Sequence, residues 1–307
     1  MRKFARTSAR LSRAARRGSG AVPGDEAARA AFLERVAMVD DCDLDPEVVE
    51  DIARLRLGRQ KGGHRASTIG SRRSHACGAT LLGASLGGRS ELPELPAGLP
   101  ECALAGRSNA GKSSLLNALC GVRPRDGAAA VSSTPGSTCS IHCYELRESA
   151  PPGSREPEPP LMTLVDLPGY GPASAAPAAA RRWGRAVRGY LRDRRQLAAA
   201  FVLVDASLGV TADDEAFLEL FDRLAQREGA PKYHVVLTKA DLLRPHALAQ
   251  AHALVHRQVA GRSGYAGGDI PIVSARSAAG VAELWDRMRQ GALAHAEAAA
   301  GDEDDEG

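Results

Sequence analysis

The chain has 307 residues, of which 44% are hydrophobic, so it can form a substantial core in one or two domains. Its formal net charge is only +3, and no apolar run approaches the ~20 residues needed to span a bilayer, so we expect a soluble protein. The cysteines lack the paired spacing of a disulfide framework, and we assign no function to them or to the group Cys139, His142 and Cys143.

Residues 1–24 contain seven Arg or Lys residues and no Asp or Glu. This Arg-rich and acid-free composition is typical of a transit peptide. The alternative is a disordered basic arm that binds RNA or keeps the chain soluble.

Residues 25–90 are expected to form a poorly ordered extension with short helices and a linker. One or two helical patterns lie in residues 25–60, and residues 61–90 are rich in Gly, Ser and Arg. The apolar positions of the helical patterns are Phe32, Val36, Val39, Val48, Ile52 and Leu55.

Residues 91–295 alternate short apolar runs with amphipathic stretches, which predicts a mostly parallel sheet with helices on both faces. Strands are expected at residues 102–105, 161–165, 199–204, 234–237 and 270–273. Helices are expected at residues 112–119, 212–227 and 248–259, with a last helix that carries Val281, Leu284, Trp285 and Met288. Thr211 is a candidate cap for the helix at 212–227.

Two further segments are expected to lie outside the sheet and its helices. The proline-rich residues 149–160 cannot form a central strand, so we interpret them as an exposed tip between two strands. The acidic residues 296–307 are expected to be solvated and disordered.

A phosphate-binding loop is predicted at residues 106–113, which read GRSNAGKS between an expected strand and an expected helix. Its glycines let backbone N–H groups and the helix N-terminus point at phosphate. Lys112 is expected to reach the β and γ phosphates, and Ser113 to supply its hydroxyl to Mg²⁺. The strand before the loop and the helix after it make a chance match improbable.

Two segments are candidate switches. Asp166 and Gly169 belong to DLPG at the end of a predicted strand, where the carboxylate can hold Mg²⁺ through water and the Gly169 N–H can contact the γ phosphate. Thr138, in VSSTPGST, is a candidate second ligand for Mg²⁺. The alternative is that Thr138 is an ordinary loop residue.

TKAD at residues 238–241 predicts selection of guanine. The carboxylate of Asp241 can accept hydrogen bonds from N1–H and the 2-amino group of guanine, whereas adenine has neither donor. We expect Lys239 to lie along the base and Ser274 and Ala275 to complete the pocket. The alternative functions of an ATPase or a small-molecule kinase would not explain TKAD after an apolar strand.

Together these motifs predict a GTPase. The candidate catalytic residues are Lys112, Thr138 and Gly169, and the candidate Mg²⁺ ligands are Ser113, Thr138 and Asp166. The candidate nucleotide-binding residues are Gly106, Arg107, Ser108, Asn109, Ala110, Gly111, Lys112, Ser113, Ser114, Asp166, Gly169, Thr238, Lys239, Asp241, Ser274 and Ala275.

Four segments in this order resemble the EngB family of ribosome-assembly P-loop GTPases: GRSNAGKSSLLNAL, TPGST, VDLPGYG and LTKAD. The likeness covers residues 91–295, and Trp183 and Asp205 also resemble the family. Departures are Ala206 and Ser207, where the family tends to carry an arginine, the insertion at 149–160, and the N-terminal extension.

The resemblance implies a GTP-driven switch in assembly of the large ribosomal subunit. It also implies that rRNA is a partner and that the protein is a monomer. The extension points to an organelle of a eukaryote, which we expect to be the mitochondrion, with the plastid as the alternative. Two other readings stay open. One is a GTP-bound RNA-binding module with little turnover, and the other is a tRNA-modification or membrane-linked GTPase, which would need a catalytic domain or lipid anchor.

Tyr170 stands where many GTPases carry the glutamine that orients the attacking water, so we expect slow intrinsic hydrolysis. A partner or a second cation would then supply the missing stabilisation. Asn109 lies where related GTPases coordinate potassium and is a candidate K⁺ ligand. The alternative is that Asn109 only braces the loop.

Five arginines fall on one stripe of a predicted helix around residues 178–195, opposite an apolar stripe. Because the helix follows the DLPG switch, we expect this arginine ridge to contact RNA phosphates, with a solvated charged face as the alternative. The ridge consists of Arg181, Arg185, Arg188, Arg192 and Arg195.

Overall fold

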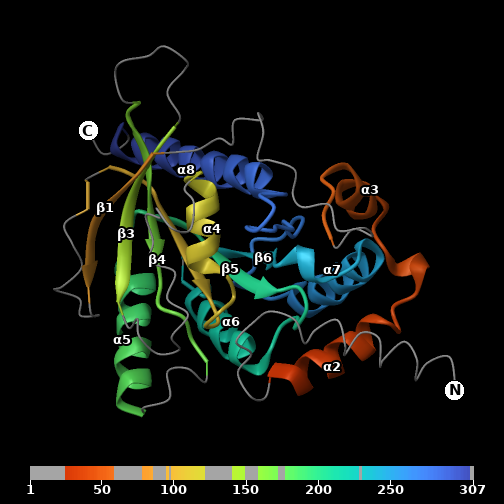
Figure 1. The fold of residues 1–307 in the computed structure, drawn as a ribbon. Coiled ribbons are helices and arrows are strands. Elements are labelled where there is room, and N and C mark those ends of the chain that lie inside the picture. The colour runs from red at the N-terminus through yellow and green to blue at the C-terminus, as the bar shows by residue number, and fades with distance from the viewer. Residues whose placement is uncertain are drawn as a thin grey trace, which may run out of the picture.

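The computed structural model describes residues 25–58, 78–85, 95–96, 98–121, 140–148, 158–171, 177–227 and 230–304. These form a six-stranded sheet with helices on both faces (Figure 1). The strands are β1 (Gly78–Ser85), β2 (Glu101–Gly106), β3 (Ile141–Arg147), β4 (Pro160–Asp166), β5 (Leu197–Asp205) and β6 (Lys232–Thr238).

The strand order is β1-β3-β4-β2-β5-β6. Strands β4, β2, β5 and β6 are mutually parallel, whereas β3 runs antiparallel to both of its neighbours, β1 and β4. This is the predicted α/β fold with a mostly parallel sheet. Because neighbouring parallel strands end at one edge of the sheet, the loops after β2, β4, β5 and β6 are brought together.

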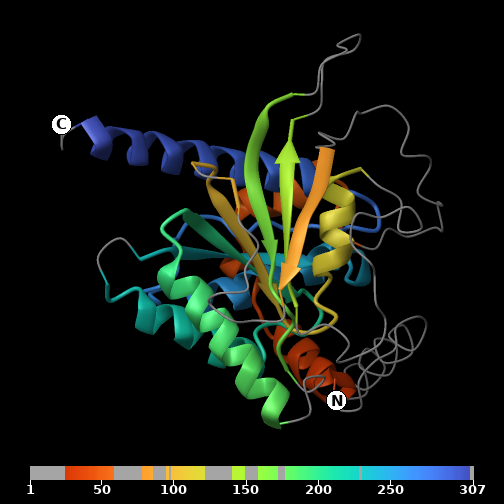
Figure 2. The ribbon, with the colours of Figure 1, turned by 90° about the vertical axis from the view of Figure 1, so that its left-hand side faces the viewer.

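Helices cover both faces of the sheet. They are α2 (Asp25–Val36), α3 (Pro46–Arg54), α4 (Lys112–Leu119), α5 (Pro177–Asp193), α6 (Ala212–Leu224), α7 (Pro245–Val259) and α8 (Val281–Asp304), with short 3₁₀ turns η1 (Asp41–Asp43) and η3 (Ala240–Leu242). In Figures 1 and 2, α8 crosses the upper part of the molecule, and α5 and α6 lie below it.

Two apolar cores lie on opposite faces of the sheet, because successive side chains of a strand point in opposite directions. In β2, Ala103 and Ala105 face a core shared with α2, α3, α5, α6 and α7. Cys102 and Leu104 face a core shared with α4 and α8. Every residue of β2 is buried, as expected for a central strand of a parallel sheet.

Local signals explain several helix starts. Thr211 caps α6 as predicted, in a capping box with Asp214 that satisfies backbone N–H groups at both positions. The Asp45 side chain accepts a hydrogen bond from the Glu47 N–H at the start of α3, where Pro46 occupies the first helical position. In residues 25–60, where one or two helices were expected, the structure has α2 and α3.

The predicted linker is wrong at one place, because residues 78–85 form β1. β1 pairs with β3 along its length, from Gly78 opposite Arg147 to Ser85 opposite Ile141. Its sequence, GATLLGAS, contains two glycines and gives little local signal for a strand. The strand therefore depends on its partner, which is distant in the sequence.

Two further expectations differ from the structure. Residues 270–273 form a single bridge to β6 at Ile272 instead of a strand, and Pro271 cannot donate to a ladder. Helix α8 continues through the predicted disordered tail to Asp304, because the alanine-rich run at residues 296–300 favours helix. The two strands expected on either side of the proline-rich segment are β3 and β4.

The described residues lack membrane-spanning helices, disulfide bonds and metal clusters. None of their helices is both long and apolar enough to cross a membrane. Their cysteines form no disulfide bond. They also contain no group of three or more His, Cys, Asp or Glu side chains placed to hold a metal ion.

Candidate nucleotide site

The phosphate-binding loop connects β2 directly to α4. β2 ends at Gly106 and α4 begins at Lys112, the bounds that the motif predicts. Asn109, at the tip, is exposed and has a φ of 66°, a left-handed conformation that is uncommon for residues other than glycine. The loop and the first turn of α4 therefore form the strand-loop-helix cradle expected for phosphate.

The DLPG segment lies directly against this loop. The Ser108 N–H donates to the Tyr170 carbonyl at 2.9 Å, and the Leu167 N–H donates to the Leu104 carbonyl at 2.9 Å. A Cβ atom added to Gly169 would lie 3.0 Å from both Lys112 Nζ and Ser108 Oγ. A larger residue at this position would press on these atoms, so the phosphate loop and the candidate switch approach each other closely at Gly169.

Burial shifts the pKa values of two charged groups at this junction, Lys112 and Asp166. Burial lowers the pKa of Lys112, and the nearby Asp166 carboxylate partly offsets this effect. Burial likewise raises the pKa of Asp166, although Lys112 and His142 act to lower it. Lys112 Nζ donates to the Gly106 carbonyl at 3.2 Å. No residue that the structure describes donates a hydrogen bond to the buried Oδ1 of Asp166.

The TKAD motif follows β6 and joins the phosphate loop through one hydroxyl group. Thr238 Oγ1 donates to the Ala110 carbonyl at 2.7 Å and lies 3.2 Å from the Val204 carbonyl. Ser274 Oγ donates to Asp241 Oδ1 at 2.7 Å. The carboxylate of Asp241, which is predicted to select guanine, is thus held by Ser274, which is predicted to complete the pocket.

Asp205, at the end of β5, fixes Lys239. The Lys239 ammonium lies 2.8 Å from Asp205 Oδ2, and the Ser207 N–H and hydroxyl donate to Asp205 Oδ1. Burial acts to raise the pKa of Asp205, but Lys239 and the Ser207 hydrogen bonds outweigh it, so the pKa lies below its ordinary value. Lys239, directly after β6, has a φ of 57°, a left-handed backbone conformation that is uncommon for residues other than glycine.

Tyr170 is an anchor for the switch. Its ring stacks on Phe217 with centroids 4.6 Å apart, and its hydroxyl donates to Asp214 Oδ1 at 2.8 Å. Both partners belong to α6. The side chain at the position of the water-orienting glutamine is therefore directed into the protein core.

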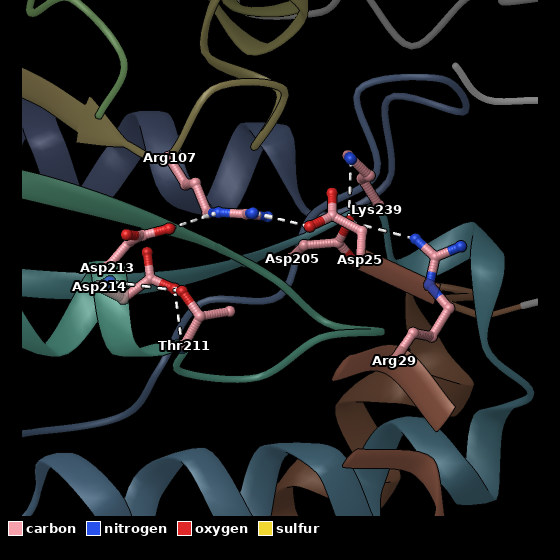
Figure 3. Close-up of polar contacts among 8 residues, drawn as sticks. All are labelled: Asp25, Arg29, Arg107, Asp205, Thr211, Asp213, Asp214 and Lys239. Atoms are coloured by element: carbon pink, nitrogen blue, oxygen red, sulfur yellow. Dashed lines mark hydrogen bonds and ion pairs between the residues drawn. The ribbon is translucent and has the colours of Figure 1, made fainter. Parts of the chain in front are cut away.

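Arg107 also has a structural role that the motif does not reveal. Its guanidinium lies between two carboxylates, with Nη2 2.7 Å from Asp25 and Nε 3.1 Å from Asp213 (Figure 3). Burial acts to lower the pKa of Arg107, but these two hydrogen bonds outweigh it and hold the pKa above its ordinary value. Asp25 lies 82 positions before Arg107 in the sequence, so no local pattern indicates the contact.

The structure brings most of the predicted site residues to one edge of the sheet. The phosphate loop meets DLPG through Ser108 and Gly169 and meets TKAD through Thr238. Ala275 follows Ser274, and Ser114 is exposed in the first turn of α4. Thr138 and Cys139 lie outside the described residues. The contacts of all these residues with nucleotide stay predictions.

Comparison with known proteins gives one family. A family model described as 50S ribosome-binding GTPase matches residues 101–239. The chain is 38% identical over 183 residues to a protein of Rhodospirillum rubrum named probable GTP-binding protein EngB, covering 60% of this chain and 72% of that protein. It is 40% identical over 171 residues to the protein of the same name from Brucella melitensis, covering 54% of this chain and 66% of that protein.

Among solved structures, the chain is similar to a probable GTP-binding protein engB at 18% identity, with a TM-score of 0.43, covering 63% of this chain and 98% of that chain. It is also similar to Era in complex with MgGDPNP and a segment of 16S ribosomal RNA, at 20% identity and a TM-score of 0.43. That alignment covers 62% of this chain and 56% of the Era chain.

Proposed function

Since the chain belongs to the EngB family of GTP-binding proteins, we propose that it is a GTP-driven switch in assembly of the large ribosomal subunit. The observation that supports this most directly is the junction of three motifs at one edge of the sheet. Gly169 of the switch approaches Lys112 of the phosphate loop, and Thr238 ties the base motif to that loop. A change at the γ phosphate can therefore be transmitted to DLPG and onward to α5.

Lys112 and the N-terminus of α4 supply positive charge to the phosphates. Lys112 donates to a backbone carbonyl of its own loop, a contact that it can exchange for phosphate oxygens. Thr238 and Ser274 hold the loop and Asp241 in place, so the base and phosphate sites keep a constant separation. Positioning of this kind, with charge stabilisation, accounts for most of the catalysis of phosphoryl transfer.

Mg²⁺ fits the donors present here. The buried Oδ1 of Asp166 receives no hydrogen bond from the described residues, and Ser113 contributes a hydroxyl at the first turn of α4. Hard oxygen donors are the ligands that Mg²⁺ prefers, and the ion when bound neutralises charge on the β and γ phosphates. Chelation with EDTA should weaken GDP binding by wild type, and Asp166→Asn should abolish this Mg²⁺ dependence.

The intrinsic hydrolysis of GTP is expected to be slow, because Tyr170 is directed into the core. A potassium ion held near Asn109 would supply positive charge to the transition state. The alternative is that Asn109, with its left-handed backbone, only braces the loop. Equal turnover in potassium and sodium, for both wild type and Asn109→Ala, would contradict the potassium role.

Helix α5 is the proposed contact with rRNA. Val187, Tyr190 and Leu191 are buried against the sheet, whereas Arg185, Arg188 and Arg192 are exposed. Arg195, just beyond the helix, is also exposed, and the side chain of Arg181 lies outside the described residues. The described part of the ridge therefore presents positive charge on the face opposite the packed stripe, and α5 follows the DLPG switch in the chain.

The ridge can be tested with two variants of equal charge. Changing Arg185, Arg188 and Arg192 to Glu should weaken binding to large-subunit precursors and reduce its salt dependence, while GTP affinity stays unchanged. The control changes three exposed arginines elsewhere, Arg223, Arg227 and Arg276, to Glu. Equal binding by both variants would contradict a specific contact through α5.

The decisive experiment on the function measures GTP turnover with and without large-subunit precursor particles. A cycling switch predicts faster turnover with the particles, and predicts that Lys112→Ala removes the increase. Particle binding without any change in turnover would favour the alternative, a GTP-bound module that docks on RNA.

The proposed site of action is the mitochondrion, with the plastid as the alternative. The support is the Arg-rich, acid-free composition of residues 1–24, which lie outside the described part of the chain. A fluorescent protein fused after residue 24 should accumulate in the organelle. A fusion that stays in the cytosol would favour the basic-arm interpretation.

A further inference from the structure

The N-terminal extension packs against the same edge of the sheet as the nucleotide site. Phe32 and Val36 of α2 belong to the core that contains α6 and α7. A Cβ atom on Gly209, which has a φ of 65°, would overlap the ring of Phe32. Gln250 of α7 donates to the Val39 carbonyl at 2.8 Å. The extension is therefore docked through both apolar and polar contacts, beside α7 in Figure 1.

The first turns of α2 also carry two charged contacts to residues of the nucleotide site (Figure 3). Asp25 pairs with Arg107 at 2.7 Å, and their side chains are 17% and 12% exposed. Arg29 lies 3.8 Å from Asp205, whose side chain is 4% exposed and which also pairs with Lys239. The Asp25 pair is short enough for a charge-assisted hydrogen bond, so it is the stronger of the two.

These contacts reach the two motifs that would hold GDP. Arg107 lies inside the phosphate loop, next to Ser108, whose N–H contacts the DLPG segment. Lys239 lies inside TKAD, next to Thr238, whose hydroxyl contacts the phosphate loop. One helix thus contacts the phosphate side through Asp25 and the base side through Arg29. Loss of either partner would leave a mostly buried charge incompletely paired.

We propose that Asp25 and Arg29 are positioning residues of the nucleotide site, through which the docked helix α2 slows the dissociation of GDP. The helix restrains Arg107 directly and Lys239 through Asp205, so that both motifs keep the geometry that bound nucleotide requires. The nucleotide site of this chain accordingly includes the N-terminal extension. The proposal depends on nucleotide binding and is independent of any role in ribosome assembly.

The test measures release of a fluorescent GDP analogue from the full chain by stopped flow, without ribosomes. Asp25→Asn combined with Arg29→Gln keeps the size of the Asp25 side chain and removes both charges, and should accelerate release about five- to tenfold, a tenfold change being ~1.4 kcal/mol. Glu26→Gln, at an exposed neighbouring position of the same helix, is the control and should release the analogue at the wild-type rate. Asp25→Glu should recover most of the wild-type rate, which a loss of packing would not.

Two further variants test the docking of α2 and the pairing of Asp25 with Arg107. Gly209→Ala displaces the Phe32 ring while leaving every charge in place, and should also accelerate release. In a double-mutant cycle with Arg107→Gln, the effect of Asp25→Asn should largely disappear, because its partner is already absent. Unchanged or slower release in the charge variant, or equal acceleration by Glu26→Gln, would overturn the proposal.

Discussion

Replacing Tyr170 by Phe tests whether this side chain is an anchor or a participant in catalysis. The substitution removes one hydroxyl group and keeps the ring that stacks on Phe217. The hydroxyl donates to Asp214 Oδ1 at 2.8 Å, whereas the N–H and hydroxyl of Thr211 donate to Oδ2. Tyr170 and Asp214 are 5% and 2% exposed, so water cannot readily replace the lost donor.

The expected cost is about 2 kcal/mol, since a hydrogen bond to a charged acceptor contributes roughly 1.5–3 kcal/mol. For a domain of this size the melting temperature should fall by ~4–8 °C in thermal unfolding. Tyr265→Phe is the control, because its hydroxyl donates to the Gly268 carbonyl at the surface and should contribute about 1 kcal/mol or less.

The GTP turnover of Tyr170→Phe, measured well below its melting temperature, should stay within about twofold of wild type, since an anchor makes no contact specific to the transition state. The opposite result, an unchanged melting temperature with a turnover reduced about tenfold or more, would show that the hydroxyl acts on the reaction. The anchor interpretation would then be refuted.

Thr238→Val should weaken GDP binding about tenfold in calorimetry, because the buried Ala110 carbonyl loses its donor, while Thr238→Ser should bind nearly as wild type. Asp241→Ala should lower GTP affinity at least about a hundredfold and remove the preference over ATP in competition assays. Burial lowers the pKa of His252 to about 4, so the unfolded state binds more protons between that pH and ~6.5. Stability in urea should therefore fall as the pH is lowered through this window, by up to about 1.4 kcal/mol per unit, and His252→Gln should reduce the slope.

Features set by local sequence were predictable. The phosphate loop and α4 were placed correctly because a glycine-rich turn, a lysine and an apolar helical pattern follow one another within a few residues. The Thr211 cap is also a local signal and is confirmed. The buried strands of the parallel sheet are predictable because they are short, continuous apolar runs, and each strand extends one or two residues beyond the predicted bounds at both ends.

Features set by distant contacts were not predictable in the same way. β1 is a strand because it pairs with β3, and its own residues favour a loop almost as well. The ion pair between Asp25 and Arg107 joins segments whose approach depends on the packing of Phe32. The orientation of Tyr170 likewise depends on its contacts with α6. Its position in the motif indicates only that it cannot orient the attacking water as a glutamine would.

The position of β1 decides where a shortened form of this protein can begin. A chain that starts at residue 91 would keep every nucleotide-binding motif, yet β3 would lose the strand that covers its outer side. The uncovered N–H and C=O groups of β3 would form a template for pairing with other chains, which is a common cause of aggregation. Retaining Gly78–Ser85 should therefore matter for soluble expression as much as the motifs matter for binding.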